Sequence, residues 1–127
     1  MKKVLVIAVH PDDETLGCGG TLLRHQAQGD EIYWMIVTGM HADQGFSAEQ
    51  IAVRDKELDA VAKAYGFKDV FRFDYPAGQL DQVPLSELVG RVSKVITEVQ
   101  PQVMYLPFSE DVHSDHRVMF SAAYSCT

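Results

Sequence analysis

The sequence has little cysteine, with only two in 127 residues and no CxxC pair. Cys18 and Cys126 stand far apart, so neither a disulfide framework nor a thiolate zinc site is predicted. We expect both to be reduced and buried as small apolar side chains. Basic residues are also scarce, because 11 Lys and Arg against 18 Asp and Glu give a net charge of −7. This balance argues against a nucleic-acid binder, which needs a basic stripe.

Long apolar runs are absent as well, and none reaches the roughly 18 residues that a membrane-spanning helix needs. Met1-Lys2-Lys3 with the apolar run after it resembles a signal peptide. However, carboxylates follow where a small-residue cleavage site would stand. We therefore predict a cytoplasmic protein with no membrane segment. No repeat or linker interrupts the chain, so we predict a single domain over residues 1–127.

An aliphatic run that ends abruptly in polar residues is the most informative stretch. Residues 4–9 are continuously apolar, which is typical of a strand buried on both faces of a parallel sheet. His10, Pro11 and three carboxylates at residues 12–14 follow at once. Ligands of open α/β sheets bind at the carboxyl ends of the strands, so these donors suggest a metal site there.

Strand-like and helix-like segments alternate along the rest of the chain, which is typical of βαβ units. We predict helices over residues 15–28, 47–65, 86–100 and 117–124, and further strands over 31–37, 70–73 and 103–106. Asp12 or Asp13 can cap the first helix, and Ser47 with Gln50 predicts a capping box at the second. The fold class is an α/β three-layer sandwich with a Rossmann-like, mainly parallel sheet.

Three residues have the types and positions of a hydrolytic metal site. His10 and Asp13 lie three apart across a strand-to-helix turn, and His116 follows the fourth predicted strand. A right-handed crossover can return that strand beside the first one. This set of donors fits Zn²⁺ best, and Fe²⁺ is the other ion that it can hold. The plainer alternative is a solvated acidic helix start and a surface histidine pair.

Two motifs carry a resemblance to a known family. Residues 8–14, AVHPDDE, are similar to the AHPDDE signature of the LmbE-like, or PIG-L, deacetylases, and residues 113–116, HSDH, resemble their HPDH motif. Residues 37–39 and 54–57 also fall where the family has equivalents. The resemblance implies zinc-dependent removal of an N-acyl group, usually acetyl, from a small glucosamine-type sugar conjugate. Family chains usually continue well beyond HPDH, so we expect residues 1–127 to be the N-terminal part of the usual domain.

The resemblance also implies roles for individual residues. It gives His10, Asp13 and His116 as metal ligands, and Asp12 as the general base. His113 would steady or protonate the tetrahedral intermediate, and Asp115 would orient His113. Arg54 would bind the substrate. General chemistry supports these roles, because amide cleavage needs an acid as well as a base. The residue that protonates the leaving amine stays open.

Several residues have a plainer structural interpretation. Arg54 has the spacing of an exposed ion pair with Glu57 on a helix. His25 is expected on a solvated helix face, His41 in a loop that could border the pocket, and Trp34 in the core.

Two other functions compete with deacetylation. One is a metal-binding domain without catalysis. The other is a Rossmann-type nucleotide-binding module, which residues 17–20 disfavour because they lack the third glycine and follow the helix start. Homo-oligomerisation is left open. The segment Pro76-Ala77-Gly78 departs from the family pattern, in which an acidic residue often precedes this glycine.

Overall fold

The computed structural model describes all 127 residues and places four parallel strands in one sheet. The sheet order is β3-β2-β1-β4, so the first strand lies between the second and the fourth. Val4, for example, pairs with Ile32 on one side and Val103 on the other. The strands are β1 (Lys3–Ala8), β2 (Glu31–Gly39), β3 (Asp69–Pro76) and β4 (Val103–Tyr105).

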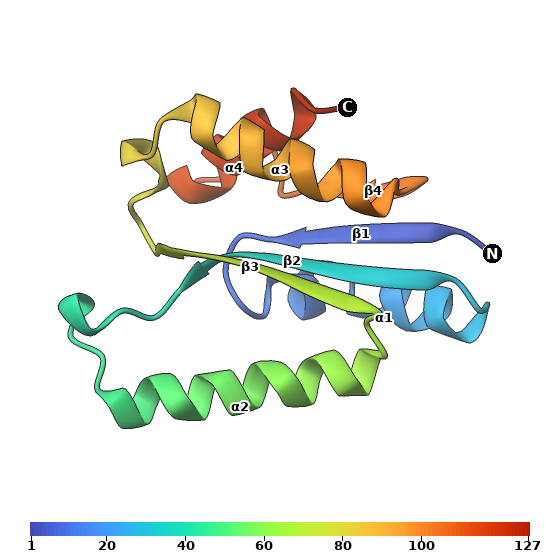
Figure 1. Ribbon diagram of the computed structural model, residues 1–127, viewed down its shortest axis with the longest axis horizontal. Coiled ribbons are helices and arrows are strands. Elements are labelled where there is room, and N and C mark those ends of the chain that lie inside the picture. The colour runs from blue at the N-terminus through green and yellow to red at the C-terminus, as the bar shows by residue number, and fades with distance from the viewer.

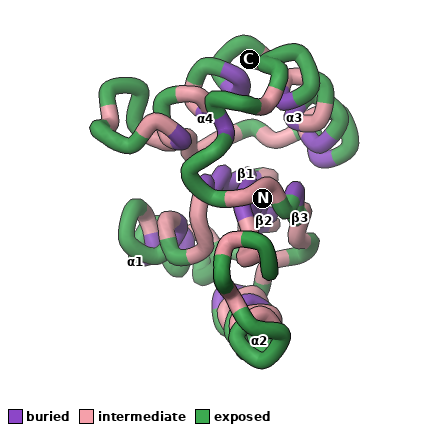
Figure 2. The backbone as a smooth tube through the Cα atoms, turned by 90° about the vertical axis from the view of Figure 1, so that its left-hand side faces the viewer, coloured by how far each residue is buried: buried purple, intermediate pink, exposed green.

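Helices cover both faces of the sheet, so the three-layer α/β/α architecture predicted from the alternation is confirmed (Figure 1). The pair α1 and α2 lies on one face, and the pair α3 and α4 lies on the other (Figures 1 and 2). The helices are α1 (Asp13–Ala27), α2 (Ala48–Tyr65), α3 (Leu85–Val99) and α4 (Ser114–Tyr124), with short 3₁₀ helices at Ala42–Gln44 and Leu80–Gln82.

The core consists of two apolar clusters, one on each face of the sheet. None of the residues from Val4 to Val9 exposes more than 4% of its surface, so the predicted doubly buried strand is confirmed. Trp34 is fully buried and stacks on Phe67, which confirms its place in the core. Figure 2 shows the buried residues gathered along the strands and the inner sides of the helices. The sheet is therefore a rigid base for the loops that leave its carboxyl edge.

The two predicted helix caps differ in outcome. Ser47 and Gln50 form the capping box at α2, with hydrogen bonds of 3.1 and 2.8 Å. The predicted side-chain cap at α1 is wrong. Asp12 occupies the N-cap position without a side-chain cap hydrogen bond, and the Asp13 carboxylate accepts the backbone N–H of His10 rather than an N–H of the helix.

Some boundaries also differ from prediction. In α1, Leu16 and Leu23 are exposed, whereas Leu22 is buried. The strand β3 runs on to Pro76 through an irregular register with β2, and α4 begins at Ser114. The predicted ranges, 70–73 and 117–124, left out polar residues that belong to β3 and α4 in the structure.

Neither cysteine is in a disulfide, as predicted, although both are half-buried and not fully buried. None of the helices has the length and apolarity required to cross a bilayer.

Candidate metal centre

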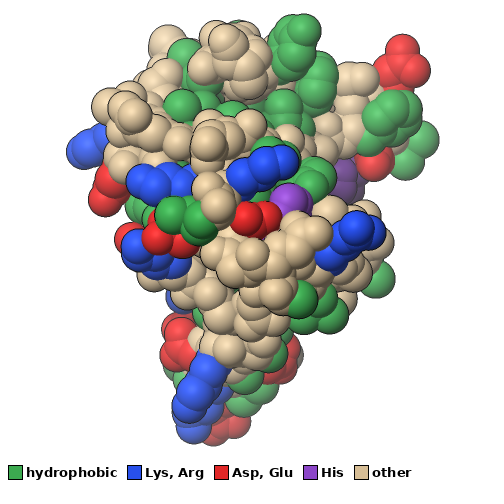
Figure 3. Space-filling model, turned by 90° about the vertical axis from the view of Figure 1, so that its right-hand side faces the viewer, with side chains coloured by type: hydrophobic (Ala, Val, Ile, Leu, Met, Phe, Trp, Pro, Cys, Tyr) green, Lys and Arg blue, Asp and Glu red, His purple; other side chains and the backbone are tan.

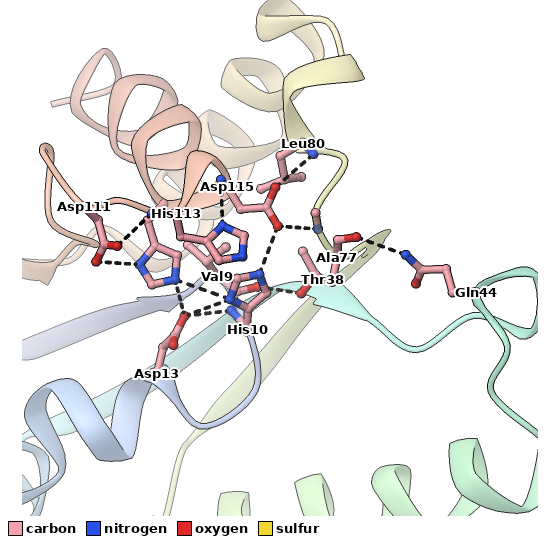
Figure 4. Close-up of polar contacts among 12 residues, drawn as sticks. Val9, His10, Asp13, Thr38, Gln44, Ala77, Leu80, Asp111, His113 and Asp115 are labelled. Atoms are coloured by element: carbon pink, nitrogen blue, oxygen red, sulfur yellow. Dashed lines mark hydrogen bonds and ion pairs between the residues drawn. The ribbon is translucent and has the colours of Figure 1, made fainter.

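The centre forms where the loops after β1 and β4 meet. These strands are neighbours in the sheet, with Val6 opposite Tyr105. The backbone N–H of His10 donates to the Asp13 carboxylate at 2.8 Å, and the N–H of Asp13 donates to the His10 carbonyl at 3.1 Å. This closed turn holds the side chains of His10 and Asp13 on one side (Figure 4). His116 arrives from the first turn of α4.

Three donor atoms converge on one point in this turn. The Nε2 atom of His116 lies 3.1 Å from Oδ2 of Asp13 and 3.3 Å from Nδ1 of His10. The third side of the triangle, from His10 Nδ1 to Asp13 Oδ2, measures 3.7 Å. Ligand bonds of about 2.0–2.1 Å in a tetrahedral zinc site separate neighbouring donors by about 3.3 Å. The triangle therefore has the size that such an ion requires.

A carboxylate stands behind each imidazole. Nε2 of His10 lies 3.0 Å from Oδ2 of Asp115, and Nδ1 of His116 lies 3.4 Å from Oδ2 of Asp111. A carboxylate favours an N–H on the nitrogen that faces it, which leaves the other nitrogen of each ring with a free lone pair. Those two free nitrogens are the ones that face Asp13. The residues present thus fit a divalent ion in tautomer as well as in distance.

Asp115 is the most thoroughly fixed side chain of the centre. It is fully buried, and its carboxylate accepts the backbone N–H groups of Gly78 at 2.6 Å and Leu80 at 3.1 Å. Burial disfavours the charge, but these bonds and the contact with His10 hold the pKa of Asp115 below its usual value. The loop after β3 thereby holds Asp115 in place, and Asp115 in turn positions His10, the candidate ligand in the loop after β1.

His113 lies beside the centre, with its ring centroid 4.6 Å from that of His10. Its Nδ1 accepts the backbone N–H of Asp115 at 3.1 Å, which leaves Nε2 as the protonated nitrogen of the neutral ring. The sequence-based expectation gave the Asp115 carboxylate to His113. The structure directs that carboxylate to His10 instead, because the start of α4 offers His113 a backbone donor.

Asp12 is exposed, and its carboxylate takes part in no hydrogen bond or ion pair. Its backbone is left-handed, with φ of 95°, and its N–H donates to the buried Glu14 carboxylate at 3.1 Å. Burial raises the pKa of the Glu14 carboxyl. Glu14 thus fixes the turn, and Asp12 presents a free carboxylate between two candidate ligands.

Two cavities flank the centre. One of about 330 Å³ includes His10, His113 and Arg54 in its lining. The other, of about 450 Å³, is lined mostly by apolar residues and reaches Asp13 and His116. Arg54 also forms the predicted i,i+3 contact with Glu57, at a long 3.9 Å. Its guanidinium therefore keeps donors available for a ligand.

Sequence reasoning missed Asp111 and the backbone donors of Gly78 and Leu80. The hydrogen bond from the His113 N–H and the nearby histidines hold the pKa of Asp111 below its usual value. Its presence two residues before His113 was the available signal. The backbone donors could not be recognised in the sequence, since every residue except proline supplies an N–H.

Other residues singled out in the sequence lie outside the centre. The prediction that His25 is solvated is wrong, since Asp30 and Tyr105 enclose it. His41 does not line the cavity and instead contacts the carbonyl of Asp74 at 2.6 Å. Residues 17–20 lie inside α1, as predicted. Gly19 makes room for the Tyr65 hydroxyl of α2.

The fold and the donor set define an α/β protein with a candidate metal site at the carboxyl edge of its sheet. The chain belongs to the PIG-L family, described as GlcNAc-PI de-N-acetylase, which matches residues 5–127. This confirms the resemblance seen in the motifs.

Similar proteins include deacetylases of N-acetylglucosamine compounds. The diacetylchitobiose deacetylase of Thermococcus kodakarensis is 28% identical over 92% of this chain and 46% of its own length. The solved N,N′-diacetylchitobiose deacetylase of Pyrococcus horikoshii superposes with a TM-score of 0.82 at 28% identity, over 98% of this chain and 49% of that one. A conserved protein of Thermus thermophilus gives 0.83 at 30% identity, over 99% and 55%. This chain thus spans about half the length of these relatives.

Proposed function

We propose that this protein is a zinc-dependent hydrolase that removes an N-acetyl group from a glucosamine-type sugar conjugate. The observation that carries the proposal is the triangle of His10, Asp13 and His116 donors, with a carboxylate behind each imidazole. Membership of the PIG-L family and the names of the relatives support the reaction type. Two free cysteines fit a reducing compartment, and a cytoplasmic location is part of the proposal.

His10, Asp13 and His116 would hold the ion, and Asp115 and Asp111 would keep the two imidazoles in the ligating tautomer. When bound, zinc polarises the amide carbonyl and lowers the pKa of water to about 7. Fe²⁺ is the other ion that this donor set accommodates.

Asp12 serves in this proposal as the general base. Its carboxylate is exposed and unpaired, and it stands in the turn between two ligands, so it is free to accept a proton from the attacking water. Glu14 holds the backbone of this turn and leaves the Asp12 side chain unobstructed.

His113 serves as the electrophilic partner. The Asp115 N–H occupies its Nδ1, so the proton of the neutral ring is on Nε2. That N–H can donate to the amide oxygen as negative charge develops there. Asp115 acts on His113 through its backbone and on His10 through its carboxylate.

Arg54 serves as a substrate-binding residue. It lines the same cavity as His10 and His113, and its contact with Glu57 is long enough to leave donors unused. A guanidinium there suits the hydroxyl or carbonyl oxygens of a sugar.

Acetate release from purified protein tests the proposal. The protein is stripped with a chelator, reloaded with Zn²⁺ or anaerobically with Fe²⁺, and assayed on N-acetylglucosamine, N,N′-diacetylchitobiose and further conjugates. Acetate release that requires the ion supports the proposal. Stoichiometric zinc without turnover on the whole panel supports a metal-binding protein without catalysis. Nucleotide binding by the metal-free protein supports a nucleotide-binding module, which no observation above favours.

A further inference from the structure

Asp74 occupies an unusual backbone conformation next to the candidate centre. Its φ of 63° lies in the left-handed region, which is costly for residues other than glycine, although aspartate tolerates it better than most. It sits inside β3, where the register with β2 shifts. Strained residues of this kind persist where the surrounding structure holds them, and they gather at ligand sites.

The surroundings of Asp74 hold it firmly. Its carbonyl contacts Nε2 of His41 at 2.6 Å, which ties the loop after β2 to the end of β3. Its carboxylate lies over the Cα of Gly39, where any Cβ would collide with Oδ1. Gly39 in turn lines the cavity that holds His10 and His113. The strained residue therefore packs against a residue that lines the cavity beside the centre.

The Asp74 carboxylate is exposed and has no hydrogen bond or ion pair. It lies in a second cavity of about 350 Å³, which shares Met40 and Arg54 with the cavity at the centre. We call this second cavity the Asp74 pocket. Its lining consists of Met40, Ile51, Arg54, Asp55, Arg72 and Asp74.

Charges within the Asp74 pocket are balanced but only partly paired. Arg72 and Asp55 form an ion pair at 3.0 Å and so satisfy each other. Asp74 keeps free acceptors, and Arg54 keeps free donors because its partner Glu57 is 3.9 Å away. The Asp74 carboxylate would repel an anionic ligand, and the Arg54 guanidinium would repel a cationic one. A neutral ligand with hydroxyl groups can donate to one and accept from the other.

We propose that the Asp74 pocket is a subsite for a neutral, hydroxyl-bearing ring of the substrate, and that Asp74 accepts a hydrogen bond from one of its hydroxyls. Met40 and Ile51 supply apolar surface for the ring, and Arg54 joins this subsite to the cavity where the amide would lie. The proposal rests on the proposed deacetylase function and makes Asp74 a determinant of its specificity.

The test combines two substitutions with two amide probes. Asp74→Gly removes the carboxylate and relieves the left-handed backbone, whereas Asp74→Asn keeps an acceptor and removes the charge. The probes are N,N′-diacetylchitobiose, which carries hydroxyls, and N-cyclohexylacetamide, which has none. A lost hydrogen bond to a charged acceptor lowers affinity about tenfold to a hundredfold.

For Asp74→Gly we expect kcat/KM on diacetylchitobiose to fall by about tenfold to a hundredfold, mostly through KM. Asp74→Asn should fall less. Turnover of N-cyclohexylacetamide and the melting temperature should not fall. Gln100→Gly is the matched control, because Gln100 is also left-handed, with φ of 53°, but caps the end of α3. It should change neither probe.

Calorimetric binding of diacetylchitobiose separates this inference from the proposed function. If the wild type releases no acetate, the proposed function fails, and binding then decides the inference. Weaker binding by Asp74→Gly than by wild type supports the subsite. Equal binding, no binding by the wild type, or an equal loss on both amide probes overturns it, since the last result indicates a structural role alone.

Discussion

The two edges of the sheet carry the same residue types and use them differently. At the amino edge, His25 contacts Asp30 through Nδ1 at 2.8 Å and the Tyr105 hydroxyl through Nε2 at 2.7 Å. At the carboxyl edge, His10 contacts Asp115 through one nitrogen, and its other nitrogen faces Asp13 and His116. The first histidine is saturated by its own neighbours. The second directs one nitrogen towards the proposed metal site.

The charged side chains of the two edges also differ in how they are paired. Figure 3 faces the end of the molecule where the strands begin, and it shows basic and acidic side chains side by side. Lys68 and Glu31, for example, form an ion pair there at 2.9 Å. At the carboxyl edge, Asp13, Asp111 and Asp115 surround two imidazoles without a lysine or arginine ion pair. Acceptors gathered in this way are stabilised by a cation, so the carboxyl edge is predicted to depend on metal and the amino edge is not.

The largest expected effect is that of His116→Ala on metal binding. The substitution removes one of three donors, and we expect zinc affinity to fall by more than about a hundredfold. Loss of a residue that only hydrogen-bonds to a ligand already lowers metal affinity about 10–100-fold. Competition with a chromophoric chelator measures this affinity. His25→Ala is the matched control from the other edge and should leave zinc affinity unchanged. Equal affinity in the wild type and His116→Ala would remove His116 from the site.

The next effect is that of Asp12→Asn on turnover. This change keeps the size of the side chain but removes the base, and we expect kcat to fall by about 10²–10⁴-fold while zinc binding is retained. Steady-state acetate release and zinc content measured on the same sample check both parts. Asp59→Asn, at an exposed position of α2 without an ion pair, is the control. Unchanged kcat would assign the base to another residue.

Asp115→Asn sharpens the comparison within the carboxyl edge. An amide can present its NH₂ to His10 and favour the wrong tautomer, so we expect zinc affinity to drop about 10–100-fold. Because Asp115 is buried and accepts two backbone N–H groups, the melting temperature without metal should fall too. Zinc titration followed by thermal unfolding separates the two effects. Retained affinity would show that His10 does not need this carboxylate.

The sequence predicted those parts of the centre that depend on local spacing. His10 and Asp13 share one turn, and the crossover rule placed His116 near them, because β4 lies beside β1. Asp115 and Asp111, the carboxylates that contact the two imidazoles, are placed by the way the loops after β3 and β4 fold. The periodicity of the sequence does not predict the conformation of these loops. The same limit explains His25: only the tertiary position of Tyr105 turns a polar helix residue into an enclosed one.

The next test concerns the stability of the amino edge. His25→Ala leaves Asp30 and Tyr105 without their shared partner, and we expect the free energy of unfolding to fall by about 1–3 kcal/mol. Denaturant unfolding of the metal-free protein measures this loss. Zinc should raise the midpoint of the variant as much as that of the wild type. A variant that loses the zinc effect would show that the edges are coupled.

The smallest expected effect is the pH dependence that Asp30 gives to the same edge. The hydrogen bond from His25, followed by one from the Lys2 N–H, holds the pKa of Asp30 below its usual value. The unfolded chain therefore takes up the proton first as the pH falls. The contribution of Asp30 is complete above its ordinary pKa of about 3.9 and is lost as the pH falls through the lower folded-state value. Melting temperatures of the metal-free protein between neutral and acid pH should thus decline less steeply in Asp30→Asn than in the wild type. Asp59→Asn should keep the wild-type slope, and identical slopes in all three proteins would mean that the amino-edge pair contributes nothing to acid stability.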